Sequence, residues 1–281
     1  MNAGATTAGL GLFAAATWGG SDFVGGLGAR RAPAMLVVGC GHLFSFLCLF
    51  AWCKGFGLAL PAGHDLLFAA LGGFEGSLAL AVFYRALAMG AMGLTAALTG
   101  LLTALIPVLF SFAREGMPPG VTIAGLAAGL VAIWLITHTP ADGGPRTPPR
   151  ALLLGAVAGC GFGAQLVLFK LAAGGGLLWT MTSARAAGTA AMVLAIAVAP
   201  PKAPWKGFWI TGLAAGTLDT LGNLFYLRAA QLGRLDVAAL VASMYPAGTI
   251  LLAAVVLRER PTRRQLVGMG LALGAVLLLS A

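Results

Sequence analysis

The sequence predicts an all-α membrane protein with ten transmembrane helices, arranged as two five-helix repeats that cross the membrane in opposite directions. Three observations lead to this prediction. The chain is too apolar and carries too few charges to be soluble in water. It divides into ten apolar runs, each long enough to cross a bilayer. One long stretch of the sequence also occurs twice, as similar copies half a chain apart.

The composition excludes a soluble domain. Of the 281 residues, 59% are hydrophobic and only 9% are charged, whereas a soluble domain carries about 25% charged residues. The 42 glycines suit membrane helices, which use small residues for close approach. The net charge of +9 does not indicate nucleic-acid binding, because the basic residues stand at the ends of apolar runs. Arg30, Lys202 and Arg263 are examples, and they are expected to face anionic lipid headgroups.

No metal, redox or cofactor site is indicated. The cysteines lie in or beside apolar runs without a Cys-x-x-Cys pair, which predicts buried, reduced thiols: Cys40, Cys48, Cys53 and Cys160. No Lys or Arg precedes Arg30, so the start of the chain lacks the charged region of a cleaved signal peptide. The first apolar run is therefore expected to remain as a membrane span.

The ten predicted spans follow from apolar runs of about 20 residues, the length that a helix needs to cross a bilayer. They cover residues 6–28, 33–53, 65–88, 92–113, 120–138, 151–172, 176–199, 206–230, 235–257 and 263–280. The connections between them are short and contain proline, glycine or charge. The longest connection, 139–150, is rich in proline and glycine and is typical of a linker.

The duplication gives the arrangement of these spans. Residues 72–118 resemble residues 216–261 at an offset of about 143 residues. The identical pairs are Arg85 with Arg228, Ala86 with Ala229, Gly90 with Gly233 and Pro118 with Pro261. The predicted domains are a first repeat over 1–138, a linker over 139–150 and a second repeat over 151–281. Five spans are an odd number, so the second repeat enters the membrane from the opposite face, and such transporters bind substrate near mid-membrane between the repeats.

Several motifs in this order resemble those of a known family. They are Trp18-Gly19, the Tyr-Arg-Ala-Leu-x-x-Gly at 84–90, Tyr245-Pro246 and the Leu-x-Glu-Arg-Pro at 257–261. With the duplication, the chain resembles the drug/metabolite transporter superfamily, in particular its ten-helix bacterial members built from two EamA-type modules. The resemblance implies secondary transport of metabolites, and bacterial members include exporters of amino acids, aromatic ones among them. The fourth span departs from the pattern, since Thr103 stands opposite Pro246 and Pro107 follows one turn later, so the halves are expected to kink at different depths.

Two carboxyl groups are the strongest candidates for chemistry. Glu75 and Asp219 stand near the centres of their spans at matching repeat positions, once the register is shifted by one residue. An acid at that depth is costly and normally faces a cavity or a partner, although a protonated or arginine-paired structural carboxyl is the alternative. Asp219 is the stronger of the two, because Asn223 and Tyr226 follow it on one helical face.

Further polar and aromatic residues share faces with this pair. Arg185 is the one basic residue well inside a span, and it is expected to pair with an acid or to bind a substrate carboxylate. His42 stands alone in its span and is expected to be a buried histidine with satisfied hydrogen bonds. The threonines of the fourth span can bond back to their own helix. The expected substrate contacts are Trp18, Asp22, Glu75, Thr99, Phe162, Gln165, Arg185, Asp219, Asn223, Tyr226, Ser243 and Tyr245.

We therefore expect a secondary transporter, not an enzyme, that exports small polar metabolites, amino acids first, through a central cavity by alternating access. Motifs for nucleotide binding, zinc-dependent proteolysis and serine hydrolysis are missing from the sequence. A flippase for lipid-linked substrates, an uptake carrier for another small cationic or zwitterionic metabolite, and a subunit without transport of its own are the alternatives. The expected location is the plasma membrane, which is the inner membrane in bacteria, and the expected partners are a small molecule, lipid and, in a coupled carrier, protons, but not nucleic acid.

Oligomeric state and orientation are left open. The Gly-x-x-x-Gly faces at 125–129 and 270–274 predict close helix packing within a monomer, with a homodimer as the alternative. Most Lys and Arg residues stand in connections that follow odd-numbered spans, so the positive-inside rule puts both termini outside the cytoplasm. The family resemblance implies the opposite orientation, with both termini inside.

Overall fold

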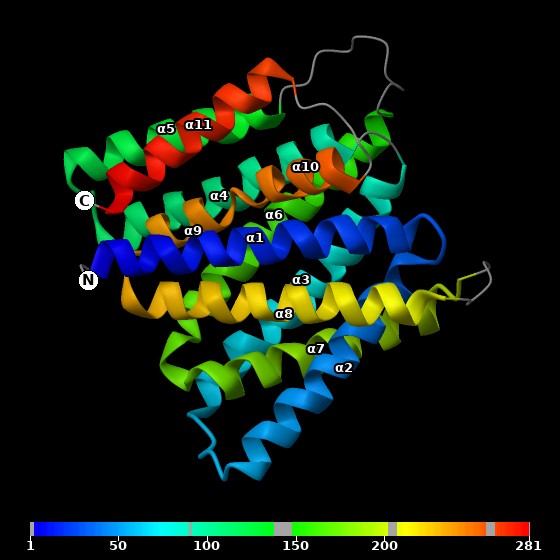
Figure 1. The fold of residues 1–281 in the computed structure, drawn as a ribbon. Helices are drawn as coiled ribbons and strands as arrows, with labels where there is room; N and C mark the ends of the chain where they lie inside the picture. Colours follow the sequence, from blue (N-terminus) through cyan, green and yellow to red (C-terminus); the bar gives the residue numbers. More distant parts are fainter. Residues whose placement is uncertain (1–2, 90–91, 138–147, 202–206, 257–261, 281) are drawn as a thin grey trace.

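The computed structural model describes residues 3–89, 92–137, 148–201, 207–256 and 262–280, and these residues form helices joined by short connections (Figure 1). The elements are α1 (Ala3–Ala29), α2 (Ala34–Gly55), α3 (Gly63–Ala88), α4 (Met92–Glu115), α5 (Gly120–Thr137), α6 (Pro149–Leu171), the short 3-10 helix η1 (Ala173–Gly175), α7 (Leu177–Val198), α8 (Phe208–Leu232), α9 (Leu235–Ala242), α10 (Tyr245–Val256) and α11 (Arg263–Ser280). The predicted all-α membrane fold is confirmed. In the described part of the chain, six helical segments are long and apolar enough to cross a membrane by length and composition, and the shorter apolar helix Gly120–Leu135 accompanies them.

Each predicted span is found within a few residues of its expected ends, with one difference. The ninth span is not continuous, because helix breaks at Ser243–Met244 and resumes at Tyr245 as α10. Pro246 lacks the backbone N–H that would bond to the Ala242 carbonyl, which accounts for the break. The predicted linker, 139–150, lies mostly outside the described residues, and its last two residues already belong to α6, which begins with Pro149 in its first turn.

The two halves of the chain interleave rather than lie apart. Helix α1 packs on α8, and α6, its counterpart in the second half, packs on α3. In the same way α4 packs on α6, while α9 and α10 pack on α1. The pairs α2 with α7 and α5 with α11 join counterparts directly. Exchange of the two five-helix groups turns the first pairs into one another and leaves the last two pairs unchanged, as an inverted repeat requires. Helix α1 begins at the end of the bundle where α11 finishes (Figure 1).

Glycines allow the closest of these approaches. A Cβ at Gly41 of α2 would lie 2.7 Å from the Gly216 Cα of α8, and 2.6 Å from the Gly212 carbonyl oxygen. At the counterpart contact, a Cβ at Gly73 of α3 would meet the backbone of Ala184 in α7. The helices around the centre of the bundle are therefore in backbone contact, which is how membrane helices pack without a hydrophobic driving force.

Small residues on the outer helices behave differently in the two halves. A Cβ at Gly125 of α5 would meet Leu279 of α11, and one at Gly129 would meet Leu240 of α9, so this face packs within the monomer. Nothing lies within 4 Å of the Cβ positions of Gly270 and Gly274 in α11. The predicted close packing within the monomer thus holds for α5, and it does not hold for this face of α11.

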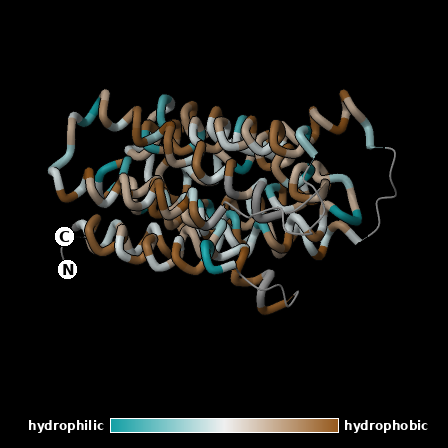
Figure 2. The backbone as a smooth tube through the Cα atoms, turned by 90° about the horizontal axis from the view of Figure 1, so that it is seen from above, coloured by the Kyte–Doolittle hydropathy of each residue, from teal (hydrophilic) through white to brown (hydrophobic). Residues whose placement is uncertain are grey.

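The outer surface is apolar along the helices, and Figure 2 shows hydrophobic segments from one end of the bundle to the other. Large side chains such as Leu47, Trp52 and Leu277 are exposed, as expected for a surface that faces lipid. The prediction of buried cysteines is wrong in part. Cys53 is buried, but Cys48 and Cys160 lie exposed on outer faces of their helices, where an apolar thiol is tolerated by lipid.

Candidate functional site

A cavity lies between the two halves, among α1, α3, α4, α6, α8 and α10. It holds about 360 Å³ of empty space, including open solvent at its mouth. Its lining residues are Trp18, Asp22, Leu80, Thr103, Phe162, Gln165, Leu166, Asp219, Asn223 and Tyr245. Because both halves contribute, the cavity has the position predicted for a substrate site in an inverted repeat.

Helical periodicity places these side chains on the helix faces that line the cavity. On α1, Trp18 and Asp22 are four residues apart, and on α8 the same spacing separates Asp219 from Asn223, so each pair lies on one face. The repeat relation extends to the lining. His42 and Arg185 are 143 residues apart, and at the same offset Asp22 of α1 falls on Gln165 of α6, and Leu80 of α3 falls on Asn223 of α8. The cavity therefore lies where counterparts from the two repeats meet.

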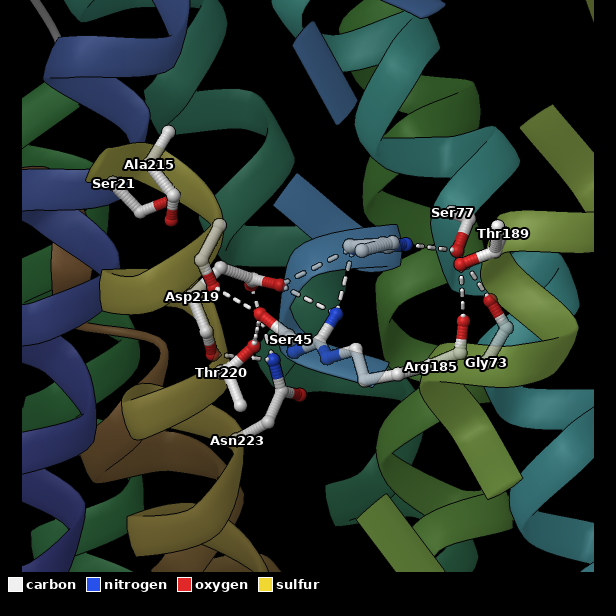
Figure 3. A network of polar contacts seen from close by, with 12 residues as sticks. Ser21, Ser45, Gly73, Ser77, Arg185, Thr189, Ala215, Asp219, Thr220 and Asn223 are labelled. Atoms are coloured by element: carbon white, nitrogen blue, oxygen red, sulfur yellow. Dashed lines mark hydrogen bonds and ion pairs between the residues drawn. The ribbon is translucent and has the colours of Figure 1, made fainter. Parts of the chain in front are cut away.

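Asp219 is held in a buried ion pair beside this cavity. Its Oδ2 lies 2.8 Å from Arg185 Nη1, and its Oδ1 accepts a hydrogen bond of 3.0 Å from Asn223 Nδ2. The His42 Nε2 atom lies 3.5 Å from Asp219 Oδ2 and 2.6 Å from Arg185 Nη1. Three buried side chains from α2, α7 and α8 thus form one polar cluster, which Figure 3 shows with its neighbours. We call His42, Arg185 and Asp219 the central triad.

One hydroxyl contact extends the central triad to α3, and a second lies beside it between two of its helices. Ser77 Oγ lies 2.9 Å from His42 Nδ1 and donates to the Gly73 carbonyl within α3. Thr220 Oγ1 donates to Ser45 Oγ at 2.8 Å, which joins α8 to α2 (Figure 3). The Ser77 contact holds the His42 ring from the side of α3.

Asp22 has no such partner. The side chain is 5% exposed and lines the cavity, and no hydrogen bond or ion pair within the described ranges involves its carboxylate. Other polar atoms near the cavity are also buried without a hydrogen-bond partner in the described structure, namely Asn223 Oδ1 and the Tyr245 hydroxyl. Buried polar groups normally have partners, so these atoms are candidates for contact with a bound molecule.

Aromatic rings form the apolar walls. Trp18 lies 5.9 Å from Tyr226 and 6.3 Å from Tyr245, between ring centroids. Phe162 packs edge-on against Phe83 at 5.7 Å. The Tyr226 hydroxyl donates to the Leu166 carbonyl at 2.9 Å, so Tyr226 supports the wall from behind and does not itself line the cavity.

Four other expected contact residues also lie off the cavity lining. Thr99 bonds back to Thr95 O and across to Gly155 O, which joins α4 to α6. Ser243 ends α9 and is fully buried, and its hydroxyl has no partner in the described residues. Arg185 stands behind Asp219.

The fourth of these residues, Glu75, departs from the expectation for a physical reason. It was matched to Asp219 by a one-residue shift, and one residue turns a helix by about 100°. At the unshifted offset Gly76 is the counterpart of Asp219, and a Cβ there would meet the amide of Gln165. Glu75 points away from this space and lies against Gly161 of α6.

The sequence reasoning missed some residues of the site. Leu80, Thr103 and Leu166 line the cavity, and His42 belongs to the central triad. The repeat offset in the sequence could have indicated two of them, His42 and Leu80. At the offset that revealed the duplication, His42 falls on Arg185 and Leu80 falls on Asn223, so the polar residue of one repeat marks the position in the other.

The comparisons with known proteins agree with this architecture. Residues 149–281 match the model of the EamA-like transporter family. A solved structure, described as a crystal structure of a protein, is similar over 97% of this chain and 95% of that chain, with a TM-score of 0.74 and 18% sequence identity. It is among 28 matching chains of solved structures, and at this identity the likeness shows the fold alone. Among curated proteins no match is found.

These findings confirm the resemblance seen in the sequence. The family match covers the second repeat, and the structural likeness covers almost the whole chain. The second half of this multi-pass membrane protein is therefore similar to the EamA-like transporter family, and the whole chain shares its fold with a solved structure.

Proposed function

We propose that the protein is a secondary active transporter that exports small polar metabolites, amino acids first and aromatic ones among them, across the plasma membrane, which is the inner membrane in bacteria. The observation that carries this proposal is Asp22, a buried and unpaired carboxylate in a cavity walled by aromatic rings. A buried carboxylate without a partner is costly in a membrane, and a substrate ammonium group would relieve that cost.

The remaining lining fits the rest of an amino acid. Asp219 is already paired with Arg185, so Asp22 is the acid left for an ammonium group. Gln165, Asn223 and the Tyr245 hydroxyl supply polar contacts, and the rings of Trp18 and Phe162 supply apolar surface for a side chain.

Alternating access is supported by a polar clamp at one end of the bundle. Lys170, at the end of α6, lies 3.5 Å from Glu115 at the end of α4 and donates to the carbonyl of Ala230 in α8 at 2.8 Å. Arg234, just before α9, donates to the Gly116 carbonyl at 2.9 Å. These contacts hold together the ends of α4, α6 and α8, which line the cavity, and the start of α9. We call Lys170, Glu115 and Arg234 the terminal clamp.

The test is counterflow in proteoliposomes that contain the purified protein. A panel of radiolabelled L-amino acids is offered from outside against the same unlabelled compound inside, and aromatic amino acids should accumulate transiently. Asp22→Asn keeps the shape of the side chain and removes its charge, so it should abolish counterflow while the thermal transition of the protein is preserved. Uptake of no amino acid, or full activity of the variant, would contradict the proposal. Movement of lipid-linked substrates in the same vesicles would instead support the flippase alternative.

A further inference from the structure

The central triad places two basic side chains against one acid. We propose that His42 is a proton-binding site, and that a proton bound there replaces Arg185 as the partner of Asp219. The released guanidinium of Arg185 is then available to the carboxylate of a substrate. Only this last step rests on the proposed function, because proton binding and the exchange of partners concern the central triad alone.

The hydrogen bonds assign the resting state of His42. Ser77 uses its single hydroxyl hydrogen on the Gly73 carbonyl, so toward His42 Nδ1 it can only accept. His42 Nδ1 therefore carries the ring hydrogen. The other ring nitrogen, Nε2, is then a bare acceptor, and it accepts from Arg185 Nη1 at 2.6 Å. His42 is neutral in this arrangement, and the lone pair on its Nε2 atom accepts the hydrogen bond from Arg185.

A second proton on His42 is incompatible with this arrangement. It would occupy the Nε2 lone pair and place a cationic ring 2.6 Å from Arg185 Nη1, where two positive groups repel each other. Asp219 Oδ2 lies only 3.5 Å from the same Nε2, so the new N–H has an acceptor close at hand. Asp219 Oδ1 is already engaged by Asn223. Both cations would then share Oδ2, and their mutual repulsion favours displacement of the guanidinium by the protonated ring.

Arg185 is held in a way that allows this release. Both of its hydrogen bonds in the central triad leave from Nη1, to Asp219 and to His42. Its Nε and Nη2 atoms are buried without a partner in the described structure. Release therefore breaks contacts at one nitrogen only, and it frees a planar donor group suited to bidentate binding of a carboxylate.

The surroundings allow a proton to reach His42. The groups that face its ring are Arg185 from α7, Asp219 from α8 and Ser77 from α3. From α1, Asp22 lies at the cavity. Glu75, near the middle of α3, lies against Gly161 of α6 instead. Asp219 borders both the cavity and His42, so a proton from cavity water can pass to Nε2 through its carboxylate.

The repeat relation adds a reason why a proton bound here would act on the whole molecule. His42 and Arg185 are counterparts, 143 residues apart, on the helices α2 and α7 that join the two repeats directly. Ser77 and Thr220 are counterparts as well, and Ser77 contacts His42 while Thr220 donates to Ser45. One repeat carries a permanent cation at this position and the other a titratable one. Exchange of partners there changes contacts between the halves, where alternating access requires movement.

The first experiment follows the histidine itself by nuclear magnetic resonance. The full-length protein, with ¹⁵N-labelled histidine, is placed in lipid nanodiscs, and the His42 signal is identified by its loss in His42→Gln. At alkaline pH the ring should be in the Nδ1–H tautomer, and acidification should produce the doubly protonated ring while the helical circular dichroism is unchanged. Ser77→Ala should mix the two neutral tautomers, since the acceptor that fixes Nδ1–H is lost.

Charge variants then test the exchange of partners. Arg185→Gln removes the competing cation, so His42 should take up its second proton at higher pH than in the wild type. Asp219→Asn removes the negative charge that stabilises the protonated ring, so protonation should need lower pH. A His42 ring that stays neutral from pH 4 to pH 9 in the folded protein, or a titration that Arg185→Gln leaves in place, would overturn the proposal. None of these measurements needs a substrate.

Transport supplies the second readout, with radiolabelled aromatic amino acids in proteoliposomes. His42→Gln should lose accumulation driven by an imposed pH gradient, and any counterflow that it retains should no longer change with pH as it does in the wild type. If the variant still accumulates substrate as the wild type does, the coupling role of His42 is wrong. If the wild type moves no amino acid at all, the proposed function fails, and the resonance data still decide whether His42 binds a proton that displaces Arg185.

Discussion

At the scale of single residues, the ion pair between Arg185 and Asp219 is the main indication that the site is functional. A buried ion pair is weak evidence for stability, because the cost of removing two charges from water can exceed their attraction. Both side chains of this pair are almost fully buried. Apolar residues of similar volume would pack at this depth without that cost. The pair therefore indicates a role in the function of the protein rather than in its stability.

Breaking this pair from one side should be more harmful than removing it. Asp219→Asn leaves the cation of Arg185 buried and unpaired, and we expect a loss of about 3–5 kcal/mol in stability. The double variant Asp219→Asn with Arg185→Gln should recover much of that loss, because no charge is left without a partner. The measurement is a double-mutant cycle on thermal or denaturant unfolding in one detergent. Arg228→Gln, on an exposed side chain of α8, serves as the control and should change little.

The cycle has a clear negative outcome. If the double variant is as unstable as the sum of the two single ones, the charges are not coupled, and the central triad does not behave as the geometry indicates.

The residues of the site could be predicted only in part. The depth of Asp219 and its helical neighbour Asn223 were visible in the sequence, because helical spacing is a local property. The partner of Arg185 was not visible, since three acids were within its expected reach and only tertiary packing selects one. Glu75 was wrongly matched to Asp219 because a shift of one residue, harmless in an alignment, turns a side chain to another face.

At the scale of elements, two prolines inside spans have different effects. Pro246 separates α9 from α10, whereas α4 continues as helix through Pro107. The turn between α9 and α10 is closed by short-range bonds, such as Met244 N to Val241 O at 3.2 Å. The sequence predicted kinks at different depths and located both prolines. It did not show that one span would break, because neighbouring helices decide how the freed backbone groups are satisfied.

Glycine contacts between elements provide a sharper test of the packing. Gly41→Ala would place a methyl group 2.6 Å from the Gly212 carbonyl oxygen and 2.7 Å from Gly216 Cα, in backbone that cannot move aside cheaply. We expect a loss of about 1–3 kcal/mol, as for other overpacked interiors. The matched control is Gly9→Ala in α1, where nothing lies within 4 Å of the new methyl group. That change should be neutral or stabilising by about 0.5–1 kcal/mol, because alanine favours a helix over glycine.

Thermal unfolding of the two alanine variants in the same detergent gives the comparison. Equal stability of Gly41→Ala and Gly9→Ala would mean that α2 and α8 are further apart than the structure places them.

At the scale of the whole molecule, the pseudo-two-fold relation governs the pairing of helices and the place of the cavity, but not its ends. The terminal clamp has no equivalent by sequence at the far end, since Leu27 is the counterpart of Lys170. Helix α1 begins and α11 finishes at the end that carries the clamp (Figure 1). A clamp at one end only is what a transporter resting in one state of its cycle requires, and the contacts that form it are visible only in the structure.

The orientation of this closed end is a separate prediction. The excess of Lys and Arg in connections after odd-numbered spans places those connections in the cytoplasm, and hence the clamped end outside. A reporter fused after Ala281 that is active only when exported should therefore be active. Activity of a reporter that works only in the cytoplasm would reverse the orientation and agree with the usual drawing of the family.

The terminal clamp should control access to the cavity from its end. Lys170→Met keeps the length and apolar stem of the side chain but removes the cation that bridges Glu115 and the Ala230 carbonyl, so the ends of α4, α6 and α8 lose their common contact. With the four native cysteines replaced and Thr103→Cys placed in the cavity lining, a membrane-impermeant thiol reagent added on the clamped side should label this variant faster than the same protein with Lys170 intact. Lys54→Met is the matched control, because Lys54 ends α2 with its ammonium about 6.0 Å from aromatic rings and no ion pair in the described structure. Equal labelling of the two lysine variants would show that the clamp does not close the cavity. Faster labelling only from the opposite side would show that the clamp acts on the far end, in which case the cavity opens by a movement that the contacts at Lys170 do not restrain.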